Sequence, residues 1–120
     1  MARTRNQGSK WIREDKRLAL YARDGFACAY CCASIEDGAR LTLDHLLACE
    51  LGGSNEETNL VTCCLSCNSR KQDLTMRRWF AALRDRGVDT DKIGSRIRHL
   101  TARKLDRKLG KALLAARKPR

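Results

Sequence analysis

Aromatic side chains are scarce in this sequence, at 5% of its 120 residues, whereas charged residues make up 32%. A chain of this length forms one domain at most, and so few large apolar side chains give it a thin core. A small domain of this kind usually needs a covalent or metal staple in addition to its core. The seven cysteines are the candidates for that staple.

Two further absences restrict the class of protein. There is no run of 18 or more apolar residues, so we expect neither a membrane span nor a membrane partner. The N-terminal stretch MARTRNQGSKWIRED lacks the apolar segment of an export signal, so we expect a soluble, cytoplasmic protein. Seven is also an odd number of cysteines, which disfavours a disulfide framework and leaves reduced thiols available to a metal.

The positive charge is concentrated near the C-terminus. Residues 1–74 hold ten Lys and Arg against ten Asp and Glu, whereas residues 75–120 hold fifteen against four. The whole net charge of +11 therefore lies in the second segment. Such an excess is larger than solubility requires, and it favours nucleic acid as a partner over an anionic membrane surface.

Four of the cysteines form two C-x-x-C pairs, Cys28-Ala-Tyr-Cys31 and Cys64-Leu-Ser-Cys67, separated by 32 residues. Each pair can present two sulfurs from one tight turn, and two such turns complete a closed tetrahedral site for structural zinc. Zinc binding in such sites contributes about 10–16 kcal/mol at neutral pH, which is enough to stabilise a small domain. The ion would clamp the folded insertion that lies between the two pairs.

The other three cysteines are expected to have less specific roles. Cys63 neighbours a zinc ligand on a strand, so its side chain should face the other way, into packing. Cys32 and Cys49 are interpreted as small buried or loop thiols, and a ligand role for Cys32 in place of Cys31 remains the less favoured alternative.

The insertion also contains a group of polar residues suited to chemistry. Asp44 stands in the apolar segment LTLDHLL, where a buried carboxylate needs a metal or a cation. Asn68 directly follows a zinc ligand, and a carboxylate with an amide oxygen suits a hard ion such as Mg²⁺. An imidazole titrates near neutral pH, so His45 could accept a proton from water, although a purely structural histidine is the alternative. Because adjacent strand residues point to opposite faces, Asp44 and His45 can share a site only if the strand bends or ends there.

Four segments, RDGFACAYC, LTLDH, GGSNEETNLV and CLSCNSRK, together resemble the zinc-binding branch of the HNH endonuclease family, the ββα-metal nucleases. The resemblance covers residues 23–71. It implies that His45 is the general base and that Asn59 braces the loop beside it. It also implies that Asp44 and Asn68 bind a catalytic Mg²⁺ or Mn²⁺. The HNH domain of RNA-guided CRISPR effector nucleases has a similar Asp-His, Asn, Asn arrangement.

This resemblance implies a metal-dependent DNA endonuclease that hydrolyses phosphodiester bonds to 5′ phosphate and 3′ hydroxyl ends. DNA is expected ahead of RNA or structured nucleic acid, and a second copy of the chain or a phage or mobile-element protein stays open as a protein partner. The alternative is a zinc-dependent nucleic-acid-binding or phage packaging accessory protein of the same fold that does not cleave. The residues expected to contact nucleic acid are basic: Arg70, Lys71, Arg77, Arg78, Arg96, Arg103 and Lys104.

The expected fold class is small α+β, with a zinc-stapled ββα-metal core, an N-terminal helix and a basic C-terminal helical extension. We expect a flexible basic arm at 1–8, the zinc-binding nuclease domain at 9–74 and the extension at 75–120. Apolar spacing and turn residues predict the individual elements. The predicted helices are 9–23 with Ser9 as N-cap, 65–71, 74–87 and 89–118 divided at Gly110, and the predicted strands are 40–46 and 59–63. Trp11 and Trp79 are expected in the core, and His99 in solvent.

Overall fold

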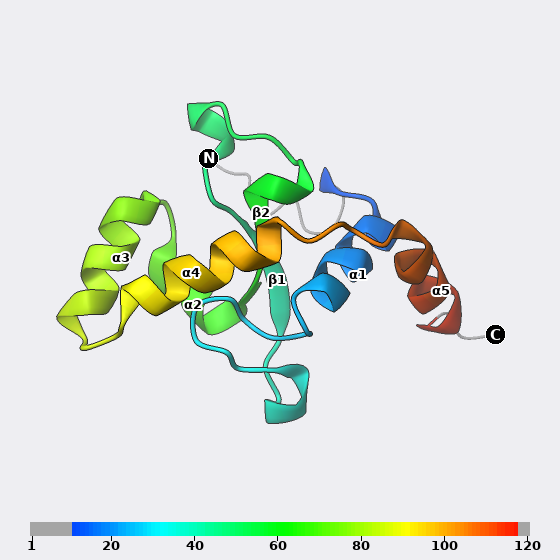
Figure 1. Ribbon diagram of the computed structural model, residues 1–120, viewed down its shortest axis with the longest axis horizontal. Helices are drawn as coiled ribbons and strands as arrows, with labels where there is room; N and C mark the ends of the chain where they lie inside the picture. Colours follow the sequence, from blue (N-terminus) through cyan, green and yellow to red (C-terminus); the bar gives the residue numbers. More distant parts are fainter. Residues whose placement is uncertain (1–10, 118–120) are drawn as a thin grey trace.

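The computed structural model describes residues 11–117, so the predicted arm at 1–8 and the predicted N-cap Ser9 lie outside the described residues. A two-stranded antiparallel sheet, β1 (Leu41–His45) and β2 (Leu60–Cys64), lies at the centre of a small α+β fold (Figure 1). The helices around it are α1 (Glu14–Arg23), α2 (Leu65–Lys71), α3 (Met76–Asp85), α4 (Thr90–Thr101) and α5 (Arg107–Arg117). The fold class predicted from the sequence is confirmed. Within the described residues, no helix combines the length and apolar character needed to cross a membrane.

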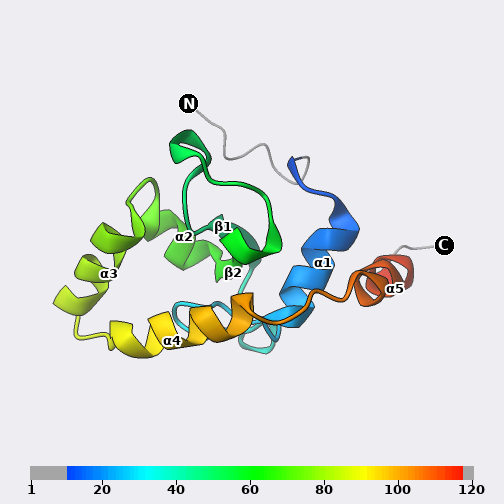
Figure 2. The same cartoon turned by 45° about the horizontal axis from the view of Figure 1, so that its top comes forward.

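Every residue of β2 is buried, because both faces of the sheet are covered. Side chains alternate along a strand, so Val61 and Cys63 face one core and Leu60 faces another. Thr62 lies on the same face as Leu60, and its hydroxyl donates a hydrogen bond to the carbonyl of Leu20 in α1. Figure 2 shows the sheet between α1 on one side and α2 with α3 on the other. The two neighbours Asp44 and His45 of β1 therefore face different surroundings.

The core around the cysteines takes much of its apolar surface from the predicted extension. Trp79 and Leu83 of α3 and Ile93 and Ile97 of α4 are buried in the same cluster as the cysteines. Burial of Trp79 confirms its predicted place in the core. The predicted boundary at residue 75 therefore does not coincide with a boundary of the packing.

Arg23 and Asp24 tie the end of α1 to β2. The helix ends at Arg23, as the following Asp24-Gly25 predicted, and Gly25 takes the left-handed conformation at φ +74°. The two buried charges form an ion pair of 2.7 Å. Asp24 also accepts a hydrogen bond from the backbone N–H of Thr62 at 2.8 Å, and Arg23 donates to the carbonyl of Leu60 at 2.6 Å. Both charges are thus satisfied where they are buried.

The long C-terminal helix is divided, but the predicted division at Gly110 is wrong. It ends as α4 at Thr101 and resumes as α5 at Arg107, and Asp106 accepts a hydrogen bond from the N–H of Leu109 at the start of α5. Gly110 lies inside α5 at its contact with α1. A Cβ atom at this position would be 2.1 Å from the carbonyl oxygen of Asp15, so only glycine permits this approach.

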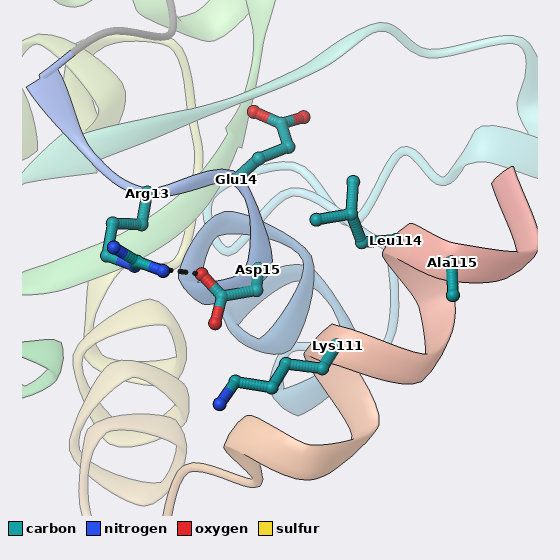
Figure 3. A pocket seen from close by; sticks show the side chains of 6 residues that line it. All are labelled: Arg13, Glu14, Asp15, Lys111, Leu114 and Ala115. Carbon is teal, nitrogen blue, oxygen red and sulfur yellow. Dashed lines mark hydrogen bonds and ion pairs between the residues drawn. The ribbon is translucent and has the colours of Figure 1, made fainter. Parts of the chain in front are cut away.

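A shallow pocket lies beside the contact between α1 and α5. Figure 3 shows its lining, with Arg13, Glu14 and Asp15 at the start of α1 and Lys111, Leu114 and Ala115 on α5. Ion pairs join the two helices as well, between Arg107 and Asp15 at 3.4 Å and between Arg117 and Glu14 at 2.9 Å. Part of the basic charge of α5 is therefore neutralised by α1.

Candidate functional site

The four cysteines of the two C-x-x-C pairs come together. Cys28 and Cys31 lie on the turn after α1, Cys64 is the last residue of β2 and Cys67 lies in the first turn of α2. Their four sulfur atoms are all within 4.8 Å of one another. The sulfurs of Cys31 and Cys64 are 3.7 Å apart, close to the spacing of about 3.8 Å for two ligands on one tetrahedral zinc with Zn–S bonds of about 2.3 Å. The four cysteines are placed to bind a metal ion, and their geometry fits zinc.

The pKa values of the clustered thiols depend on one another. Hydrogen bonds from the thiols of Cys63 and Cys67 lower the pKa of Cys28 far below its usual value. The hydrogen bond to Cys28, together with burial, raises the pKa of Cys67 far above its usual value. One thiolate, that of Cys28, is thus favoured in the cluster, whereas the formation of a second thiolate at Cys67 is opposed. A divalent cation is what would allow four thiolates to coexist in this space.

The remaining cysteines lie outside this cluster of four. Cys63 is fully buried in the core, as predicted from its position beside Cys64. Cys32 and Cys49 are exposed. Cys32 has φ +68°, which lies in the left-handed region that favours glycine. The turn after the first pair therefore has a backbone conformation that glycine adopts more readily than cysteine. The structure thus places Cys31, not Cys32, among the four candidate ligands.

Asp44 is buried and paired with a cation of the protein itself. Its side chain accepts a hydrogen bond from the hydroxyl of Tyr30 at 2.5 Å and forms an ion pair with Lys71 at 3.2 Å. Burial, followed by the charge of Asp44, raises the pKa of Tyr30 well above its usual value, so this hydroxyl stays a donor. Lys71 is only 5% exposed. The prediction that Lys71 contacts nucleic acid is therefore corrected, since its ammonium group is buried against Asp44.

Asn68 belongs to α2, the helix whose Lys71 pairs with Asp44. It is half-buried and stands three residues before Lys71, so the two share a face of the helix. The carboxylate and amide oxygens of Asp44 and Asn68 suit a hard divalent ion, and the surroundings of Asp44 already favour a positive charge. Such an ion would compete with the ammonium group of Lys71 for the same carboxylate.

His45 is the last residue of β1 and lies on the opposite face from Asp44. Its ring is 4.8 Å from the ring of Trp11, which is half-buried and not a full core residue. Its Nε2 atom lies 2.7 Å from Oδ1 of Asn55 and 3.5 Å from the sulfur of Cys49. The strand does end at His45, but the side chains of Asp44 and His45 still diverge.

Asn59 holds the loop that follows His45. Its amide accepts a hydrogen bond from the N–H of Leu47 at 2.9 Å and donates to the carbonyls of Leu47 at 3.0 Å and Ser54 at 2.8 Å. Its backbone carbonyl accepts from the N–H of Leu46 at 2.9 Å. One side chain thus joins the beginning of the loop to its far end, next to His45.

The basic residues predicted to contact nucleic acid differ in their availability. Arg96 is half-buried and donates a 2.6 Å hydrogen bond to the carbonyl of Ala29, so it supports the first cysteine turn. Arg103 is exposed, although one of its nitrogens donates to the carbonyl of Arg23 at 3.3 Å. His99 is exposed, as predicted. The exposed members of the predicted set are Arg70, Arg77, Arg78, Arg103 and Lys104.

Two neighbours of the candidate site were not singled out from the sequence. Tyr30 lies inside the first C-x-x-C pair. An aromatic residue between two candidate ligands could have indicated from the sequence that its side chain packs beside the metal cluster. Asn55 lies in the polar loop GGSNEETN, and no pattern distinguishes it from the other polar residues there. Its contact with His45 spans ten residues of a loop and depends on the folded path of the chain.

The sequence model of the HNH endonuclease family matches residues 28–79. This segment contains the four clustered cysteines together with Asp44, His45, Asn59 and Asn68. Comparisons with curated proteins and with solved structures gave no match. Residues 28–79 of this chain are therefore similar to the HNH endonuclease family, and the same segment contains four cysteines placed to bind a metal ion.

Proposed function

We propose that this protein is a metal-dependent DNA endonuclease that hydrolyses phosphodiester bonds. The observation that carries the proposal is the setting of His45 within the segment that is similar to the HNH family. The imidazole is half-buried at the end of β1, where Asn55 and Trp11 contact it and Asn59 holds the following loop. A histidine held by polar partners beside solvent is suited to proton transfer, whereas one packed among apolar side chains is not.

In the proposed reaction, His45 takes a proton from a water molecule as the water oxygen attacks phosphorus. The bond between phosphorus and the 3′ oxygen breaks, and the leaving oxygen takes a proton from solvent, which gives a 5′ phosphate and a 3′ hydroxyl. A divalent ion on Asp44 and Asn68 would neutralise the growing charge on the phosphate and on the leaving oxygen. Tyr30 keeps the Asp44 carboxylate in position through its hydrogen bond.

The opposite orientations of Asp44 and His45 restrict where the phosphate can lie. β1 has β2 on one edge only, and among the described residues no strand pairs with its other edge. A phosphate at the end of β1 could meet His45 from one face and the Asp44 side from the other. The proposed site is therefore at the end of β1, next to the loop that Asn59 holds.

The exposed arginines and Lys104 would contact the phosphate backbone, which favours DNA or RNA without distinguishing their sequences. We place the nuclease site within residues 9–74 and assign residues 75–120 two roles, because they supply both core side chains and the excess positive charge. A second candidate function is supported by the Asp44–Lys71 ion pair. A domain that neutralises its own metal-binding carboxylate could serve as a nucleic-acid-binding accessory protein without cleavage.

A plasmid-nicking assay with Mg²⁺ or Mn²⁺ separates these functions. We expect His45→Ala to lower the nicking rate by about 10²- to 10⁴-fold, since a general base contributes that much. Zinc content, melting temperature and DNA affinity should stay close to those of the wild type, because the base acts in the transition state. His99→Ala, which removes the exposed histidine of α4, is the matched control and should nick normally. Equal nicking by His45→Ala, or no nicking by the wild type, favours the accessory function.

A further inference from the structure

Asn55 is held by two hydrogen bonds, one to its side chain and one to its backbone, although it lies in an exposed loop. Its Nδ2 group donates to the carbonyl of Trp11 at 3.4 Å, and its backbone carbonyl accepts from Lys16 at 2.8 Å. Both partners belong to the segment that begins α1, about 40 residues away along the chain. Asn55 thus links the loop after β1 to the helix that covers the His45 face of the sheet.

These contacts determine which end of the amide faces His45. The carbonyl oxygen of Trp11 can only accept a hydrogen bond, so it requires the NH₂ end of the Asn55 amide. The other end, Oδ1, then lies 2.7 Å from Nε2 of His45. An amide oxygen can only accept, so Nε2 must donate and carry the proton. In the neutral imidazole, Nδ1 is then the nitrogen with a free lone pair.

We propose that Asn55 is the positioning residue of the general base. Its Oδ1 atom holds the imidazole of His45 with the proton on Nε2 and leaves Nδ1 to accept the proton of the attacking water. The ring of Trp11, 4.8 Å from the imidazole and tilted by 39°, limits rotation of the ring about this hydrogen bond. The inference rests on the proposed function, because it assigns a partner to the base named there.

Cys49 is the other group near the same nitrogen. Its sulfur lies 3.5 Å from Nε2, against 2.7 Å for the oxygen of Asn55. A thiol is also a weak donor and a weak acceptor, so the shorter contact to a strong acceptor decides the tautomer. Cys49→Ala is therefore expected to leave the ring as it is, which makes it a control for the effect of Asn55.

The tautomer can be measured in the zinc-loaded full chain without DNA. The chain has two histidines, so His99→Gln assigns the signals of His45 in long-range ¹H–¹⁵N spectra. At about pH 8, where imidazole is neutral, we expect a proton on Nε2 that exchanges slowly with water and an unprotonated Nδ1. Asn55→Ala should make this proton exchange quickly, whereas Asn55→Asp, which keeps an acceptor, should preserve it. A proton on Nδ1 in the wild type, or an unchanged spectrum in Asn55→Ala, overturns the proposal.

Nicking kinetics test the catalytic consequence. We expect Asn55→Ala to lower kcat by about 10- to 100-fold with little change in KM, since a misplaced base affects the reaction more than binding. Asn55→Asp should recover part of this loss. Glu56→Gln changes the neighbouring exposed residue, whose side chain makes no contact with His45, and should cleave at the wild-type rate. In a His45→Ala background, Asn55→Ala should cause no further loss.

The two proposals can fail separately. If His45→Ala nicks as fast as the wild type, the proposed function is wrong whatever the tautomer. If His45→Ala is inactive but Asn55→Ala nicks at the full rate, the proposed function stands and the role of Asn55 is refuted. A further loss on adding Asn55→Ala to His45→Ala also refutes it, because Asn55 would then act elsewhere. If Asn55→Ala fails to fold, the spectrum and rate of Asn55→Asp decide, and loss of the protected Nε2 proton there overturns the proposal.

Discussion

Lys71→Met tests the ion pair at the centre of the proposed metal site. Lys71 and Asp44 are 5% and 8% exposed, and they lie 3.2 Å apart. The substitution keeps an apolar stem of similar length but leaves the carboxylate with Tyr30 as its only hydrogen-bonding side chain among the described residues. Removing one partner of a buried pair costs about 3–5 kcal/mol, which is a large part of the stability of a small domain. A domain of this size loses about 4 °C or more of melting temperature for each kcal/mol.

The same variant reports whether the carboxylate accepts a divalent ion. With Lys71 replaced, Mg²⁺ would no longer compete with an ammonium group, so we expect it to raise the melting temperature of Lys71→Met more than that of the wild type. At about one hundred times its dissociation constant, a ligand stabilises by about 2.7 kcal/mol, which is enough to recover much of the loss. Calorimetric unfolding over a series of Mg²⁺ concentrations measures this effect without any cleavage.

The double variant Asp44→Asn with Lys71→Met is the matched control. It removes both charges, so it should be less destabilised than Lys71→Met alone, because no buried charge is left without a partner. It should also lose the response to Mg²⁺. A Lys71→Met protein that melts within about 2 °C of the wild type would show that the pair carries little of the stability. Equal responses to Mg²⁺ in all three proteins would refute Asp44 as an ion ligand.

Two further predictions concern stability. Elemental analysis should find about one zinc per chain. Circular dichroism should show that Cys67→Ser unfolds the domain, whereas Cys49→Ser, at an exposed thiol, should leave it folded. A protein that is folded without zinc would contradict the structural role of the metal. Glycine inside a helix is less favourable than alanine by about 0.5–1 kcal/mol. A Cβ atom at Gly94 would meet only ordinary contacts, at 3.5 Å and 3.8 Å, so Gly94→Ala should raise the melting temperature. Gly110→Ala should lower the melting temperature and speed hydrogen exchange in α5, because its Cβ would lie 2.1 Å from a carbonyl oxygen of α1. Equal effects of the two substitutions on the melting temperature would contradict the observed contact between α1 and α5.

The metal cluster could be predicted from the sequence because the two ligands of each pair lie only three residues apart along the chain. Two sulfurs on one short turn are already arranged for a shared ion, and the fold needs only to bring two such turns together. The end of α1 at Arg23 was predictable for a similar reason, since Asp24-Gly25 acts within a single turn of chain. Burial of Trp79 followed from apolar spacing on its helix.

Contacts between distant segments could not be predicted in this way. From the sequence, Lys71 is only a basic residue on a predicted helix. Its ion pair with Asp44 depends on the packing of α2 against β1. Gly110 reads as a helix breaker until α5 is placed against α1, where it permits the close approach. Asn55 is one polar residue among several until the loop folds back on α1. In each case the role depends on a partner at least ten residues away.

The geometry of β1 explains why the loop after it matters for the proposed chemistry. Adjacent residues of a strand point in opposite directions, so Asp44 and His45 lie on different faces of the sheet, one against Tyr30 and Lys71 and the other against Asn55. Packing of the sheet alone cannot aim both groups at one phosphate. The position of the imidazole must therefore be fixed by the segment that follows it, which Asn59 fastens at both ends. On this reasoning, variants that loosen the loop should impair proton transfer while leaving the surroundings of Asp44 unchanged.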